Sequence, residues 1–180
     1  MGRKLQNSEL NRLSIEEFKQ SPKLPVIIVL DNVRSQHNIG AAFRTSDAFR
    51  IESIFLCGIS STPPNSEIHK SALGAEDSVD WQYFENAVDA INILKKNGYK
   101  IISIEQTEDS IMLNNFLPDN DKKYAFVFGN EVRGVSQPVV DASDLCIEIP
   151  QEGTKHSLNV SVSIGIVLWE FYKNLKSVLS

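Results

Sequence analysis

Short apolar runs recur along the chain, and their spacing sets the predicted architecture. Five of them are continuous rather than alternating and are rich in Val, Ile and Phe: residues 25–30, 53–58, 99–104, 124–129 and 145–149. Continuous runs of this length are typical of parallel strands that are covered on both faces. Helical stretches or loops separate the runs, so the pattern predicts an α/β fold in which helices sandwich a parallel sheet.

Segments between these runs carry helix signals of different strength. Residues 86–98 begin with a capping asparagine and end with paired lysines and a stop glycine: Asn86, Lys95, Lys96 and Gly98. A capping box that starts at Ser14 predicts a short amphipathic helix, or a pair of helical turns, within residues 8–20. Residues 60–78 form the longest irregular stretch, which is too long for a plain connection and is expected to be functional or mobile.

The last predicted helix, over residues 157–175, has two apolar faces. One face carries Ile164, Val167, Leu168 and Phe171, and the other carries Val162, Gly165, Ile166 and Trp169. The first face can pack against the sheet. The second face needs cover from the N-terminal segment or from a second copy of the chain, and the pattern favours a homodimer.

Length and composition indicate one ordinary globular domain. The chain has 180 residues, of which 42% are hydrophobic, so it can bury a core without disulfides or a metal. It has no apolar run of about 18 residues and no signal segment, so we expect a cytoplasmic protein without a membrane span. The two cysteines stand in apolar runs and the three histidines lie far apart in sequence, which disfavours a metal site.

The net charge of −5 argues against a protein that coats nucleic acid without specificity, because phosphate binding draws on a surplus of basic residues. The charge is unevenly distributed, however. Residues 1–50 contain eight basic and five acidic side chains. This part of the chain is where a polyanion would dock.

The sequence NIGAAFR, residues 38–44, raises a specific possibility for anion binding. Asn38 is a good N-cap, which predicts a helix that starts at Ile39. Its inward face would consist of Ile39, Ala42, Phe43 and Ser46. Arg44 would then lean over the turn that contains Gly40, where no side chain blocks it, and face the free N–H groups of the helix start. The alternative is a surface pair between Arg44 and Asp47, which spacing alone favours.

Two further loops follow apolar runs. Residues 129–134, GNEVRG, form a glycine-bracketed loop at the end of a predicted strand, where open α/β sheets bind ligands. Glu131 stands where the dinucleotide fingerprint needs a glycine, which disfavours an oxidoreductase of that type, and its carboxylate can also serve only to brace a tight turn. Before the last helix, Ser157 and Asn159 are candidate caps in a loop rich in backbone donors.

Taken together and in this order, three motifs resemble those of the SPOUT superfamily, specifically its SpoU or TrmH-like branch of RNA ribose 2′-O-methyltransferases. They are N-x-x-x-x-x-R at residues 38–44, F-G-N-E-x-x-G at residues 128–134 and I-P-x-x-G-x-x-x-S-L-N-V-S-V at residues 149–162. The resemblance spans about residues 25–172. It implies an α/β sheet whose C-terminal part is threaded into a deep trefoil knot, an exception to the rule that chains do not thread loops.

The resemblance also implies the cofactor and the site residues. S-adenosylmethionine would lie in the knot, against Ile104, Glu105, Gly129, Ile149, Ser157 and Leu158. The polar residues of the reaction centre would be Asn38, Arg44, Glu131, Ser157 and Asn159, at an interface between two subunits. Gln151 departs from the family, which usually has methionine there, but main-chain atoms make that contact. Because a guanidinium keeps its proton, we expect Arg44 to clamp phosphate and stabilise alkoxide.

The resemblance divides the chain into an N-terminal helical extension, residues 1–22, and a methyltransferase domain, residues 23–180. The extension would contact either RNA or the second subunit. A catalytically inactive RNA-binding protein that retains the fold is the alternative, and the presence of all five polar residues favours the enzyme. With no separate N-terminal RNA-binding domain in the sequence, tRNA is favoured over rRNA, while the modified nucleotide stays open.

Overall fold

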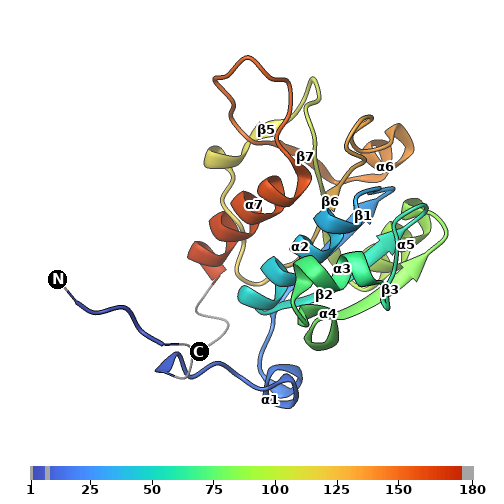
Figure 1. Cartoon of the computed structure of the whole chain (residues 1–180). Helices are drawn as coiled ribbons and strands as arrows, with labels where there is room; N and C mark the ends of the chain where they lie inside the picture. The colour runs from blue at the N-terminus through green and yellow to red at the C-terminus, as the bar shows by residue number, and fades with distance from the viewer. Residues whose placement is uncertain (1, 7–8, 176–180) are drawn as a thin grey trace.

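Within residues 2–6 and 9–175, which the computed structural model describes, the chain forms one seven-stranded sheet (Figure 1). The strand order is β3-β2-β1-β6-β4-β7-β5, and every paired strand runs parallel to its neighbour. The strands are β1 Leu24–Asp31, β2 Ile51–Cys57, β3 Asp80–Phe84, β4 Tyr99–Ile104, β5 Ile111–Met112, β6 Lys123–Phe128 and β7 Leu145–Glu148.

Helices cover both faces of this sheet. They are α1 Ile15–Gln20, α2 Gln36–Ala48, α3 Ser66–Ala72, α4 Ala75–Ser78, α5 Ala87–Lys96, α6 Gln137–Ala142 and α7 Val160–Leu175, with a short 3-10 turn, η2, at Leu113–Asn115. The helices α2, α3 and α7 pack on one face, and α5 and α6 pack on the other (Figure 1). None of the described helices has the length and apolar character needed to cross a membrane.

Strand β1 shows why the apolar runs are continuous. Its side chains alternate between two hydrophobic cores: Ile28 and Leu30 pack under α2 and α7, whereas Ile27 and Val29 pack under α5. A strand with a core on each side needs an apolar residue at every position. The predicted α/β sandwich is therefore confirmed, and all five predicted strands are present.

The structure adds elements that the sequence pattern did not predict. Strand β3 at one edge is half polar and largely exposed, and β5 at the other edge has two residues, so neither gives an apolar run. The prediction that residues 60–78 are an irregular stretch was wrong in part, because α3 and α4 fold there and pack against α2. The opening helix α1 begins only at Ile15, so one helix over residues 8–20 is not confirmed, and residue 8 itself lies outside the described residues. The capping box at Ser14 is confirmed.

The start of α2 also corrects the sequence-based prediction. The helix begins at Gln36 rather than Ile39, because the hydroxyl of Ser35, and not the side chain of Asn38, caps it. The Ser35 Oγ accepts a hydrogen bond from the Asn38 N–H at 3.3 Å. The side-chain amide of Asn38 is thereby free to bind elsewhere. The predicted inward face is confirmed, since Ile39, Ala42, Phe43 and Ser46 are all buried.

Helix α7 has the two apolar faces that its sequence predicts. Ile164, Val167, Leu168 and Phe171 are buried against the sheet. On the opposite face, Val162, Ile166 and Trp169 are 49%, 37% and 53% exposed. Trp169 lies against Phe49 and Tyr172 at its edge, so the described residues cover this face of the helix only in part.

A glycine in α2 fixes how closely α3 approaches. A Cβ built on Gly40 would lie 2.4 Å from the carbonyl oxygen of Ile68 and 3.0 Å from the backbone nitrogen of Ala72. Both atoms belong to the backbone of α3 and cannot move aside without shifting that helix. The space beside Gly40 is therefore filled by α3 and is not open to Arg44, so this part of the sequence-based interpretation was wrong.

We expect Gly40→Ala to lower the free energy of unfolding by about 1 to 3 kcal/mol, since it overpacks the contact between two helices. Chemical denaturation measures this change. Gly153→Ala is the matched control, because nothing lies within 4 Å of a Cβ at that glycine. Equal stability of the two variants would show that α3 does not rest on α2 in this way.

Candidate functional site

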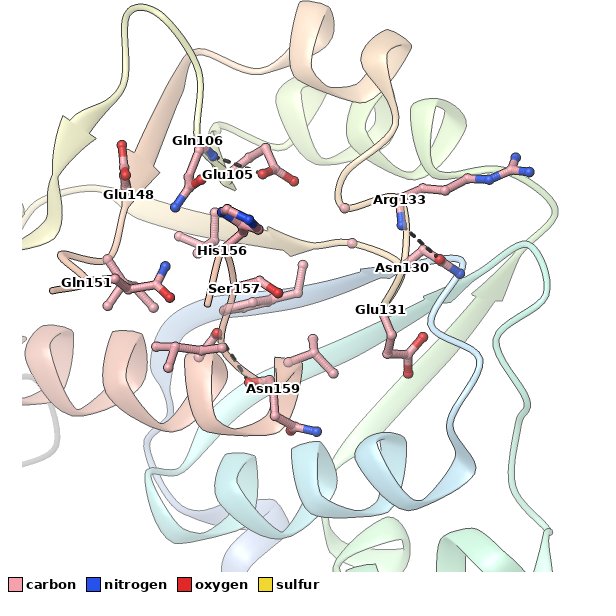
Figure 2. Close-up of a pocket in the computed structure, with 18 of the residues that line it drawn as sticks. Glu105, Gln106, Asn130, Glu131, Arg133, Glu148, Gln151, His156, Ser157 and Asn159 are labelled. Atoms are coloured by element: carbon pink, nitrogen blue, oxygen red, sulfur yellow. Dashed lines mark hydrogen bonds between the residues drawn. The ribbon is translucent and has the colours of Figure 1, made fainter. Parts of the chain in front are cut away.

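A cavity of about 540 Å³ opens at the carboxyl ends of β4, β6 and β7, beside the start of α7 (Figure 2). Cavities that hold small molecules in other proteins have volumes of about 300 to 1,000 Å³. The cavity is lined by all six residues that the resemblance assigns to the cofactor: Ile104, Glu105, Gly129, Ile149, Ser157 and Leu158. Three segments far apart in sequence thus meet at one hollow.

The lining combines an apolar wall with a polar mouth. Phe128, Ile147 and Val160 contribute buried apolar surface. His156 and Ser157 lie between the Glu105 segment and α7, whereas the side chain of Arg133 extends away from the cavity (Figure 2). Such a lining suits a ligand with one flat apolar part and one polar part.

The loop after β6 is tightly closed on itself. The backbone groups of Asn130 and Gly134 exchange two hydrogen bonds, of 3.0 and 2.8 Å. A Cβ on Gly129 would lie 2.0 Å from the carbonyl carbon of Gly134, so no larger residue fits there. Gly134 has a φ of +68°, in the left-handed region that favours glycine. Both glycines that bracket the loop are therefore required by its geometry.

Glu131 joins this loop to the start of α2. Its carboxylate accepts hydrogen bonds from the N–H of Arg34 at 3.0 Å, from the N–H of Ser35 at 2.9 Å and from the side-chain amide of Asn38 at 3.0 Å. Partial burial opposes its charge, but these donors outweigh that effect and lower the pKa of Glu131 below its ordinary 4.5. The carboxylate is therefore ionised at neutral pH.

Asn38 is also hydrogen-bonded to the residue that precedes the last helix, α7. It is 8% exposed, and its side-chain oxygen accepts a hydrogen bond from the amide of Asn159 at 3.2 Å. The side-chain oxygen of Asn159 accepts in turn from the N–H of Ser161 at 2.9 Å, at the start of α7. The side chains of Asn159, Asn38 and Glu131 therefore form one hydrogen-bonded chain across three elements, which we call the amide–carboxylate chain.

The sequence interpretation missed contacts that fix the segment after the β6 loop. Asp31, 2% exposed at the end of β1, accepts hydrogen bonds from the Ser136 N–H at 2.9 Å and from its hydroxyl at 2.7 Å. Glu105 does more than line the cavity, since its carboxylate accepts the N–H of Val135 at 2.8 Å. An aspartate that directly follows an apolar strand was the available sequence signal for Asp31.

Arg44 does not lie at this cavity. Its exposed side chain borders a separate depression of about 360 Å³ that α1, α2 and α4 enclose. Among the ion pairs of the described residues there is none between Arg44 and Asp47. The Asp47 carboxylate instead accepts a hydrogen bond from the hydroxyl of Ser78 at 2.6 Å. Within one chain, the structure thus brings together Asn38, Glu131, Ser157 and Asn159 but leaves Arg44 apart.

Comparison with known sequences shows which family this chain is similar to. The family described as "SpoU rRNA Methylase family" matches residues 25–169. An uncharacterized tRNA/rRNA methyltransferase of Borreliella burgdorferi is 34% identical over 172 residues, with coverage of 96% of this chain and 73% of its own. A 23S rRNA (guanosine-2′-O-)-methyltransferase of Neisseria meningitidis is 34% identical over 161 residues, with coverage of 89% of this chain and 63% of its own.

Solved structures give the same result for the fold. A TrmH/SpoU tRNA modifying enzyme of A. aeolicus aligns with a TM-score of 0.79 and 26% identity, over 91% of this chain and 83% of that one. An AdoMet-bound rRNA methyltransferase of Sinorhizobium meliloti aligns with a TM-score of 0.77 and 25% identity, over 88% of this chain and 60% of that one. The chain belongs to the SpoU family of RNA methyltransferases.

Proposed function

We propose that this protein transfers a methyl group from S-adenosylmethionine to a ribose 2′-hydroxyl of RNA, that the RNA is a tRNA, and that the enzyme works in the cytoplasm. The amide–carboxylate chain beside the cavity carries the proposal. It holds polar groups from three elements at the edge of a nucleoside-sized hollow. The related tRNA modifying enzyme of A. aeolicus supports the choice of tRNA.

The residues of the cavity fit S-adenosylmethionine. Ile104, Ile149 and Leu158 offer apolar surface for a purine ring, and the loops around them expose backbone groups for its polar edge. Gly129 lets the backbone at Gly134 and Val135 close on it, which shapes the wall of the hollow. When bound, this cofactor supplies an electrophilic methyl group on a sulfonium, and an AdoMet-bound structural relative supports its use here.

Glu131 acts by positioning rather than as a base. Its carboxylate already accepts three hydrogen bonds, which occupy most of the roughly four lone-pair sites of such a group. It fixes the start of α2 and the loop after β6 relative to each other, and the ribose hydroxyl would be oriented against that fixed frame. The hydroxyl proton leaves to solvent or to a phosphate of the substrate.

Arg44 reaches the reaction centre from a second copy of the chain in this proposal. Its distance from the cavity of its own chain and the partly uncovered face of α7 at Val162, Ile166 and Trp169 both support a homodimer. A guanidinium keeps its proton, so Arg44 would hold an RNA phosphate and stabilise the developing alkoxide.

Two finer features of the architecture belong to the same proposal. The family supports a deep trefoil knot formed by the chain after β6, which would enclose the cofactor. The basic residues of the N-terminal extension, residues 1–22, support contact of this segment with RNA phosphates.

Ribosomal RNA is the second candidate substrate. The relative from Neisseria meningitidis, at 34% identity, is named as a 23S rRNA methyltransferase. The chemistry at the ribose would be the same for both RNAs. The difference would lie in the surface that docks the RNA around the cavity.

We expect the purified protein to bind S-adenosylmethionine at one site per chain and to transfer labelled methyl groups to tRNA. Calorimetry measures the binding, and mapping of the labelled ribose in total tRNA and total rRNA identifies the substrate. Label in rRNA alone would show that the substrate is ribosomal RNA and not tRNA. Binding without transfer to either RNA would favour a protein that has lost turnover.

We expect Arg44→Ala to cost about 3 kcal/mol or more in transition-state stabilisation while the affinity for S-adenosylmethionine stays nearly unchanged. Mixing this variant with Asn159→Ala tests whether Arg44 acts across the dimer. Mixed dimers would contain one intact site, so activity should recover to about a quarter of the wild-type value if subunits mix randomly. Absence of recovery in a mixture that has exchanged subunits would contradict action across the dimer.

We expect Glu131→Gln to lower kcat/KM by about 10- to 100-fold, since an amide cannot accept all three hydrogen bonds and the loop shifts. Glu108→Gln is the control, because Glu108 is exposed and forms no ion pair among the described residues. Because the folded pKa of Glu131 is lowered, its stabilising effect is present above pH 4.5 and is lost as the pH falls through the folded pKa. A stability difference from wild type that does not shrink in acid would contradict this role.

A further inference from the structure

Another hollow, of about 570 Å³, lies at the β3 edge of the sheet. It is separate from the proposed cofactor cavity, which Ile104, Gly129 and Leu158 line. Pro63, Pro64 and Trp81 form its apolar lining. Its polar lining consists of Asn65, Ser66, His69, Glu76 and Asp77. We call it the Trp81 depression. None of these residues takes part in the amide–carboxylate chain or lines the cofactor cavity.

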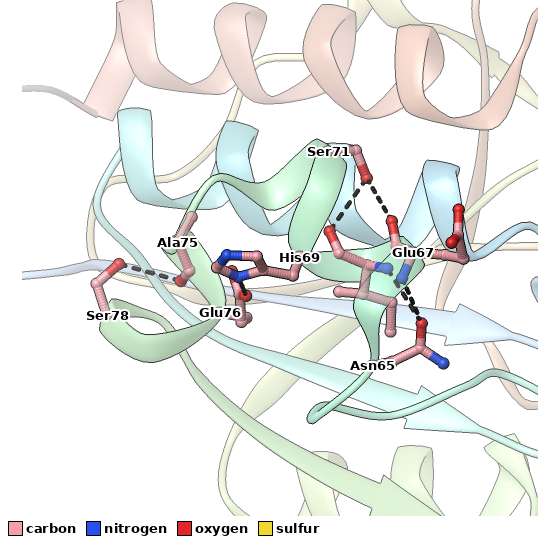
Figure 3. A network of polar contacts seen from close by, with 8 residues as sticks. Asn65, Glu67, His69, Ser71, Ala75, Glu76 and Ser78 are labelled. Carbon is pink, nitrogen blue, oxygen red and sulfur yellow. Dashed lines mark hydrogen bonds and ion pairs between the residues drawn. The ribbon is translucent and has the colours of Figure 1, made fainter.

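The carboxylate of Glu76 is incompletely satisfied in this depression. Its side chain is 8% exposed, and its Oε1 lies 2.5 Å from the Nδ1 of His69 (Figure 3). Its Oε2 is buried and accepts no hydrogen bond from any described residue. A buried acceptor without a donor is costly, and such groups in native proteins often mark the place of a missing partner.

The local backbone holds this carboxylate in place. Leu73 and Gly74, between α3 and α4, both have left-handed φ angles, of +55° and +91°. This tight turn brings Glu76 back beneath His69 (Figure 3). Because α3 rests against Gly40 of α2, the whole pair sits on a fixed support. The turn thus fixes the side chain of Glu76 at the lining of the depression.

The lining selects a ligand that is flat and rich in N–H donors. Trp81 and the two prolines present apolar surface, on which a planar ring can stack. Glu76 and Asp77 can only accept hydrogen bonds when ionised. A guanine base matches both features, because its N1–H and its exocyclic amino group lie side by side on one edge of a planar ring.

We propose that the Trp81 depression binds a guanine base of single-stranded RNA, stacked on Trp81 and bonded through its Watson–Crick edge to Glu76 and Asp77. This inference rests on the proposed function, since it assigns part of the RNA recognition. The loop that leads to Pro63 supports it, because Ser61 in that loop accepts a hydrogen bond from Gln36 at the first turn of α2, at 3.2 Å. An RNA held at the amide–carboxylate chain can continue along this loop.

Tryptophan fluorescence can detect the stacking directly. The chain has two tryptophans, so Trp169→Phe leaves Trp81 as the sole reporter. In that variant, guanosine 5′-monophosphate should quench the fluorescence with a saturable curve. Inosine 5′-monophosphate lacks the exocyclic amino group and should bind at least about fivefold more weakly, because one acceptor then loses its donor. Uridine 5′-monophosphate should give no saturable quenching.

Glu76→Gln, added to Trp169→Phe, should weaken the binding of guanosine 5′-monophosphate at least about tenfold, since an amide N–H2 replaces an acceptor. Glu67→Gln is the matched control on α3, where Glu67 pairs with Lys70 at 2.6 Å outside the depression. Equal binding of the guanosine and inosine nucleotides by Trp169→Phe would overturn the proposal without any change at Glu76.

Two further outcomes separate this inference from its alternatives. Saturable quenching by N-acetyl-arginine amide but not by guanosine 5′-monophosphate would show that the depression takes a cationic peptide side chain, and would overturn the proposal. Calorimetry with S-adenosylmethionine reports on the other cavity. Cofactor binding and RNA methylation without guanine binding would contradict this inference but not the proposed function. Guanine binding without cofactor binding would contradict the proposed function but not the binding of guanine in the depression.

Discussion

The carboxylate of Glu131 holds the loop after β6 to the start of α2, and the position of this loop at the cavity lined by Ile104, Gly129 and Leu158 depends on this junction. The loop and the helix follow different strands of the sheet, and parallel strands fix only where each loop begins. The hydrogen bonds of Glu131 with Arg34, Ser35 and Asn38 then fix where the two segments meet. Asn159 extends the junction to the start of α7, so hydrogen bonds connect side chains of three motifs that are distant in sequence.

Close backbone approach is the second constraint on this fold. Gly129 lets the loop after β6 close on Gly134, and Gly40 lets α3 lie directly on α2. Neither glycine opens a space for a ligand by itself. Each one allows two backbones to touch. One hollow is lined by Gly129 itself, and the Trp81 depression lies beyond α3.

The sequence predicted the central strands and the paired faces of α7 because these elements are apolar throughout or at helical spacing. It did not predict β3, whose outward side chains are polar at the sheet edge, or the short helices α3 and α4. Two prolines precede α3, and Gly74 separates it from α4. The resemblance supplied residues that do line the cavity, but local spacing could not show that α3 occupies the space beside Gly40. The anchoring roles of Asp31 and Glu105 depend on contacts between distant loops, which no local pattern contains.

A crystal structure of the protein with S-adenosylmethionine would test directly whether the Glu131 junction borders the cofactor site. We expect the cofactor in the cavity between the segments at Ile104, Gly129 and Leu158, with the hydrogen bonds from Asn38 to Glu131 and from Asn159 to Asn38 intact. A cofactor bound elsewhere, or bound in this cavity with the Glu131 carboxylate turned away from α2, would contradict it.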